Sequence, residues 1–64
     1  MTTYIDEYDS IYTIHETTFT NPVNGNPTVL FVLINESGTV LRVSTATWDI
    51  KVWVRDFALD LVAA

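Results

Sequence analysis

Histidine is the side chain best suited to acid–base chemistry near neutral pH, and this chain of 64 residues has one, His15. It stands in the stretch SIYTIHETTFT, directly before Glu16. Neighbouring side chains on an extended strand point to opposite faces, so His15 and Glu16 do not meet. Thr13 and Thr17 share the face of His15, but no third group orients the ring towards a hydroxyl. The spacing predicts a structural or surface histidine and no catalytic residue.

The densest group of carboxylates is Asp6, Glu7 and Asp9. A calcium loop needs carboxylates at alternating positions and a glycine at its sharp turn, and this stretch has neither. The absence of cysteine and the single histidine exclude thiolate and imidazole-rich zinc sites. Gly25 and Gly38, the only glycines, do not form a phosphate-binding loop. No metal ligand and no cofactor are predicted, and the carboxylates are either a solvated acidic segment or a recognition element.

The net charge of −5 lies entirely in the first two-thirds of the chain. Residues 1–41 contain five acidic residues and no lysine or arginine. Residues 42–64 contain three acidic residues, which Arg42, Lys51 and Arg55 balance. Binding to nucleic-acid phosphates needs lysine and arginine to displace counterions, so this charge argues strongly against direct nucleic-acid binding. The same charge favours attraction to a basic protein surface.

Three segments rich in β-branched and aromatic residues predict strands at 10–20, 28–35 and 39–45. The stretch NPVNGNP at 21–27 and the tetrad Asn35–Gly38 have the composition of turns. Residues 1–9 combine apolar residues at helical spacing with a β-branched continuation, and an extended acidic arm is favoured over a helix or disorder.

The last third of the chain predicts a helix that begins after Thr47, a candidate N-cap, with Asp49 in its first turn. No glycine or proline interrupts it, so the helix is expected to run almost to Ala64. One apolar stripe has core spacing: Ile50, Trp53, Val54, Phe57, Ala58 and Leu61. A second stripe contains Trp48, Val52, Leu59 and Val62. The predicted fold is α+β, a single domain over residues 1–64 with a three-stranded antiparallel meander and one C-terminal helix packed on one face (β-β-β-α).

One helix covers only one face of such a sheet, yet the stretch TVLFVLI at 28–34 is apolar on both faces. Leu30, Val32 and Ile34 point one way, while Val29, Phe31 and Leu33 point the other. An antiparallel strand with one wet face alternates polar and apolar residues instead. We therefore expect this strand to be interior in the sheet, with its second face covered by a partner protein or by another copy of the chain.

These features favour a small, acidic, non-enzymatic protein-binding module. Its most plausible form is an inhibitor that occupies a basic, nucleic-acid-binding surface of a partner protein, with carboxylates where phosphates otherwise lie. Small phage anti-defence proteins of the anti-CRISPR type act in this way, and the analogy rests on size and charge alone. The alternative is a structural module that forms a homodimer through its second apolar face. The residues expected to contact a partner are Tyr4, Asp6, Glu7, Tyr8, Asp9, Tyr12, Glu16, Glu36 and Trp48.

The sequence also predicts a cytoplasmic location. The first twenty residues have no basic start, as a secretory signal requires. The apolar run at 28–34 is far shorter than the roughly 20 residues of a membrane span, so no membrane partner is expected.

Overall fold

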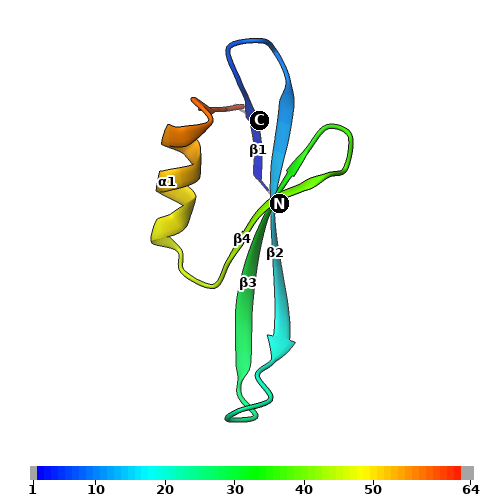
Figure 1. The fold of residues 1–64 in the computed structure, drawn as a ribbon, viewed down its shortest axis with the longest axis vertical. Helices are drawn as coiled ribbons and strands as arrows, with labels where there is room; N and C mark the ends of the chain where they lie inside the picture. The colour runs from blue at the N-terminus through cyan, green and yellow to red at the C-terminus, as the bar shows by residue number, and fades with distance from the viewer. Residues whose placement is uncertain (1, 63–64) are drawn as a thin grey trace.

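The fold is α+β, with one antiparallel sheet and a single helix among the described residues (Figure 1). The computed structural model describes residues 2–62, so Met1 of the predicted arm and the predicted helix end at 63–64 lie outside it. The elements in chain order are β1 (Thr2–Ile5), β2 (Ile11–Thr20), β3 (Pro27–Asn35), β4 (Val40–Ser44), α1 (Trp48–Asp56) and β5 (Asp60–Leu61).

The sheet has five strands in the order β4-β3-β2-β1-β5, and each neighbouring pair is antiparallel. The prediction of three strands was therefore wrong in number, although the three predicted strands are present as β2, β3 and β4. The sequence left residues 1–9 open, and Thr2–Ile5 pairs with Ile11–Ile14 as β1. The other additional strand, β5, forms from residues that were predicted to be helical. As expected, β3 is an interior strand, between β4 and β2.

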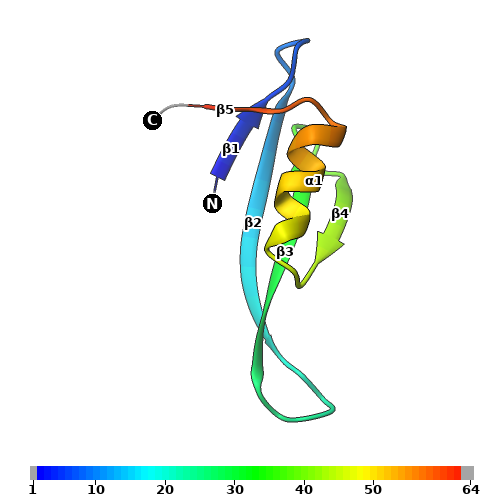
Figure 2. The same cartoon turned by 90° about the vertical axis from the view of Figure 1, so that its left-hand side faces the viewer.

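Helix α1 packs on one face of this sheet, in front of β3 (Figure 2). The buried core consists of Ile14, Phe31, Leu33, Trp53 and Leu59. Leu33 is fully buried, because it is opposite Ile14 on an interior strand and beneath the helix. Ile50, Val54 and Phe57 pack around these residues from the helix side. The predicted core stripe of the helix is thus confirmed as far as Phe57.

Helix α1 ends at Asp56, not near Ala64, and the reason is a backbone motif that needs no glycine. The N–H of Ala58 donates to the carbonyl of Arg55 (3.2 Å), and the N–H of Leu59 donates to the carbonyl of Val54 (2.8 Å). These two bonds form a Schellman motif, with Ala58 at the left-handed position (φ 50°). The chain then reverses so that Leu59 enters the core. The predicted second stripe is therefore divided between α1, the core and the segment that contains β5.

Two local predictions around β4 also need correction. Thr47 precedes the helix, but its side chain makes no capping bond. Ser44 stabilises the approach to the helix instead, since its hydroxyl donates to the carboxylate of Asp49 in the first turn and accepts the N–H of Ala46 (3.0 Å). A register shift opposite Leu33 and Ile34 places an extra residue, Leu41, in β4. The sequence places Leu41 and Val43 on one face of this strand and Arg42 and Ser44 on the other, and the shift breaks that alternation at Leu41.

The predicted turns are confirmed. In the turn between β3 and β4, Asn35 Oδ1 accepts the N–H groups of Ser37 (3.0 Å) and Thr39 (2.9 Å), and Gly38 has φ 85°. In the turn between β2 and β3, the N–H of Asn21 donates to the carbonyl of Asn26 (2.9 Å) and Gly25 has φ 70°.

Strands β2 and β3 extend well beyond α1 and form a two-stranded hairpin arm, seen at the bottom of Figure 1. We define the hairpin arm as residues 17–30. Its strands pair with each other from Thr17↔Leu30 to Thr20↔Pro27. Strands β1 and β4 pair only with the remaining parts of β2 and β3, at residues 11–14 and 31–34. The sheet is consequently five strands wide at one end and two strands wide at the other. The molecule is elongated, with a longest extent of 42 Å.

Candidate functional site

Five carboxylates gather at the wide end of the sheet, and we call this group the acidic end: Asp6, Glu7, Asp9, Glu36 and Asp60. The first three are in the turn between β1 and β2, and Glu36 is in the turn between β3 and β4. The two turns are close, since the N–H of Ile11 donates to Glu36 Oε2 at 3.4 Å. Asp60 joins them because β5 pairs it with Ile5, the residue before Asp6.

Asp6 holds the first of these turns in shape. Its Oδ1 atom accepts the N–H groups of Tyr8 and Ser10, and its Oδ2 atom accepts the hydroxyl of Tyr12, each at 2.9 Å. Desolvation raises the pKa of Asp6, but the hydrogen bonds from Ser10, Tyr12 and Tyr8 favour the charged form and hold the pKa below its ordinary value overall. Because its oxygens are occupied by hydrogen bonds within the turn, Asp6 shapes the acidic end. Glu7 and Asp9 in the same turn are exposed to solvent.

The three tyrosines predicted to contact a partner have different environments. Tyr12 packs against the core, with its ring 6.0 Å from that of Phe57. The hydrogen bond to Asp6, burial and the charges of Asp6 and Glu36 together raise the pKa of the Tyr12 hydroxyl. Tyr4 also packs against the core. Tyr8, which is 80% exposed at the tip of the turn, is the one available for a partner at the acidic end.

The cationic side chains are on other elements. Arg42 in β4 lies over the ring of Phe57, with its guanidinium carbon 5.1 Å from the ring centroid. Lys51 and Arg55 are in α1, and Arg55 pairs with Asp56 at 3.5 Å, the one ion pair within residues 2–62. No carboxylate of the acidic end is thus neutralised by an ion pair in the described part of the chain.

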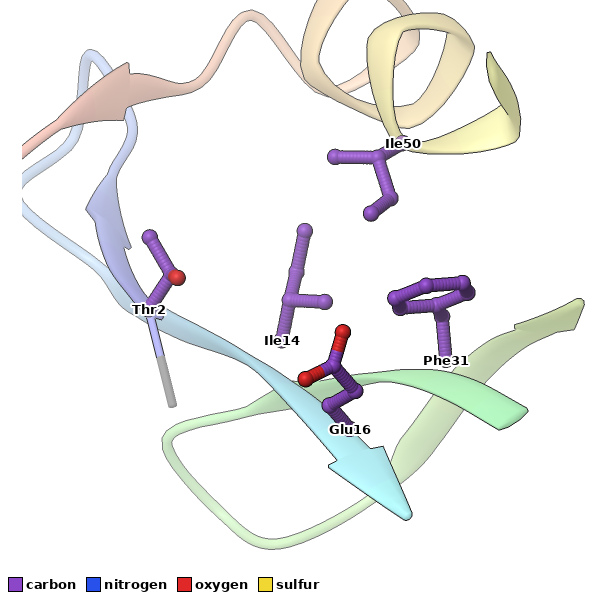
Figure 3. Close-up of a pocket in the computed structure, with 5 residues that line it drawn as sticks. All are labelled: Thr2, Ile14, Glu16, Phe31 and Ile50. Carbon is purple, nitrogen blue, oxygen red and sulfur yellow. The ribbon is translucent and has the colours of Figure 1, made fainter. Parts of the chain in front are cut away.

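Two of the predicted contact residues are away from the acidic end. Trp48, which is 66% exposed, begins α1 at the helix end nearer the hairpin arm. Glu16 is on the helix side of β2, where it lines a hollow of about 110 Å³ with Thr2, Ile14, Phe31 and Ile50 (Figure 3). Pockets for small ligands usually measure about 300–1,000 Å³, so this hollow does not support a ligand site.

No catalytic or metal centre emerges from the described residues. His15 is exposed, and the pairing of His15 with Val32 and of Glu16 with Phe31 places those two side chains on opposite faces, as predicted. No group of three or more histidine or carboxylate side chains in residues 2–62 is arranged to hold a metal ion.

The second candidate surface is the face of the sheet opposite α1, which we call the open face. Pairing and alternation assign to it Thr3, Ile5, Ile11, Thr13, His15, Thr17, Phe19, Thr28, Leu30, Val32, Ile34, Val40, Val43 and Asp60. No helix or strand among residues 2–62 is stacked on it (Figure 1). Val40 and Val43 are each 54% exposed, and Ile11 is 47% exposed. The prediction that the 28–34 strand carries apolar side chains on both faces is confirmed.

Asp60 was missed as a member of the acidic end. The sequence places it on a helix flank with Asp49 and Asp56, because no glycine or proline marks the end of the helix. The only signal for the true arrangement is the need to bury Leu59, which the Schellman motif at Ala58 satisfies.

The fold and the two surfaces together describe a small α+β domain with an acidic end and an apolar open face. Comparison with known proteins finds no matching family model, no matching curated protein and no matching solved structure. The helix described within residues 2–62 is not long and apolar enough to cross a bilayer.

Proposed function

We propose that this chain is a non-enzymatic protein-binding module whose acidic end occupies a basic, nucleic-acid-binding surface of a partner protein. The observation that carries the proposal is the gathering of five carboxylates from three separate parts of the chain at one end of the sheet. A basic groove that binds phosphates offers the complementary charge, and such complementarity speeds association and selects the partner.

The turns that carry these charges are held by their own side chains, which supports a binding role. Asp6 fixes the turn before β2, and Asn35 fixes the turn after β3. Glu7, Asp9 and Glu36 are therefore presented from ordered backbone. Less conformational entropy is lost on binding from such a surface than from a flexible acidic tail.

Tyr8 adds apolar contact surface to the carboxylates of the acidic end. It is exposed among the carboxylates, and tyrosine is enriched at binding interfaces because its ring is large and rigid and its hydroxyl forms hydrogen bonds. The module acts in the cytoplasm in this proposal, a setting that suits a chain without cysteine.

The test measures whether the chain displaces duplex DNA from purified basic DNA-binding proteins, at several salt concentrations. We expect displacement by at least one such protein, weakening steeply as salt rises because the attraction is screened. Glu7→Gln with Glu36→Gln removes two charges from the acidic end, and Glu16→Gln with Asp56→Asn removes two charges elsewhere. The first pair is expected to weaken displacement at least tenfold and the control pair to change it little.

Equal effects of the two variant pairs would show that only total charge matters and would contradict a defined acidic surface. Displacement that does not depend on salt would contradict occupation of a basic groove.

A further inference from the structure

The open face is apolar and almost free of charge in a chain that is strongly acidic. Among the residues assigned to this face, His15 and Asp60 are ionisable, and Asp60, in β5 opposite Ile5, lies at its margin. The remaining side chains are threonines and aliphatic or aromatic residues. Monomeric proteins rarely leave a continuous apolar patch of several hundred square ångströms exposed, so this face requires a cover.

We propose that a second copy of this chain covers the open face, with the two sheets packed face to face and their strands antiparallel. The face carries one carboxylate, Asp60 at its margin, and is otherwise apolar or neutral, so a second face of the same kind matches it best and a copy provides one. This surface shares only Asp60 with the acidic end, so the inference does not rest on the proposed function.

The face has the size that a dimer needs. With strands about 4.8 Å apart and a rise of about 3.3 Å per residue, the five strands together span roughly 480 Å² in projection. The accessible area of the projecting side chains is larger than this projection. Stable interfaces bury about 600–1,000 Å² per partner, and the lower part of that range is within reach of this face.

Electrostatic repulsion fixes the relative direction of the two copies. A two-fold axis parallel to the strands would place the two acidic ends side by side. An axis across the strands places them at opposite ends of the dimer, and each molecule is 42 Å long. Salt screens charges over about 8–10 Å, so repulsion between the acidic ends is negligible only in the second arrangement.

The hairpin arm fixes where that axis crosses the sheet. On β2 the open-face residues run from Ile11 to Phe19, and His15 is midway, paired with Val32. With the axis along this row, His15 faces His15 of the second molecule, and Val32 faces Val32 of the second molecule. Phe19 of each hairpin arm then covers Ile11 of the other molecule, and Leu30 covers Ile34. This arrangement covers Ile11 and Phe19, the exposed apolar side chains at the two ends of β2 on the open face.

The first test is the solution mass from light scattering, at high micromolar concentration and at low and high salt. We expect twice the chain mass of 7.2 kDa at both salt concentrations. Val43→Lys places a charge on the open face and is expected to give monomers that stay folded by circular dichroism. Val23→Lys, the same change at a 91% exposed turn position, is expected to stay dimeric.

The second test uses the absence of cysteine in the natural chain. His15→Cys is expected to form a disulfide-linked dimer under mild oxidation. Thr18→Cys, on the helix side of the same strand, is expected to remain mostly unlinked. A monomeric natural chain would overturn the proposal. So would a dimer that persists in Val43→Lys or links more readily through Thr18→Cys, because either would place the interface at a sheet edge or on the helix side.

Discussion

The hydroxyl of Tyr12 donates a 2.9 Å hydrogen bond to Oδ2 of Asp6, and this bond joins the core to the acidic end. The ring of Tyr12 packs beside Phe57 under the helix, while Asp6 organises the turn that carries Glu7 and Asp9. The order of the charged surface therefore depends on a side chain that is itself fixed by core packing.

This bond predicts that stability falls at both extremes of pH. The pKa of Asp6 is lowered in the folded state, so its contribution is complete above the unfolded value of about 3.9 and is lost as pH falls through the folded value. The pKa of Tyr12 is raised, so its contribution is complete below about pH 10 and is lost as pH rises through the folded value. Urea unfolding followed across both pH ranges measures the two effects.

Tyr12→Phe removes the hydroxyl and keeps the ring. We expect it to weaken both pH dependences and to lower the free energy of unfolding by about 0.5–1.5 kcal/mol, the net value of one hydrogen bond. Tyr8→Phe is the matched control, since the exposed hydroxyl of Tyr8 makes no hydrogen bond within the described chain. A Tyr12→Phe variant with the pH profile of the natural chain would show that the bond does not form in solution.

The end of the helix makes a different prediction, because Ala58 has a left-handed backbone conformation (φ 50°) that favours glycine. We expect Ala58→Gly to raise the free energy of unfolding by about 0.5–1 kcal/mol, since relief of backbone strain exceeds the entropy that glycine adds to the unfolded chain. For a domain of this size that corresponds to a rise in Tm of about 2–8 °C.

Lys51→Gly is the control for Ala58→Gly. Lys51 is an exposed residue within α1, where glycine is expected to lower the free energy of unfolding by about 1 kcal/mol. If Ala58→Gly also lowered stability, the helix would not end in the motif described here.

The sequence predicts the parts of the fold that have strong local signals. The turn at Asn35–Gly38 follows from residue types, and the division of the 28–34 strand between two faces follows from its alternation. The two short strands lack such signals. Each forms only because another part of the chain offers a free strand edge, as when β1 pairs on one side with β2 and on the other with β5.

The acidic end was predictable only where its residues are close together in the sequence. Asp6, Glu7 and Asp9 are adjacent in sequence, whereas Glu36 and Asp60 reach them through strand pairing. Glu16 and Trp48 were grouped with them by residue type alone. The register places Glu16 on the helix side of β2, and Trp48 begins the helix near the other end of the sheet.

The core makes the last prediction through Leu33, which has no exposed surface at all. It is opposite Ile14 in β2 and Arg42 in β4, beneath α1, so Leu33→Ala leaves a cavity that its neighbours cannot readily fill. Such substitutions cost about 2–5 kcal/mol, a large part of the roughly 3–5 kcal/mol that so small a core supplies. We expect Leu33→Ala to be largely unfolded at room temperature by circular dichroism.

Leu61→Ala removes the same atoms from a side chain that is 65% exposed and is expected to stay folded. Two variants with equal stability would mean that the sheet does not close over Leu33 as described.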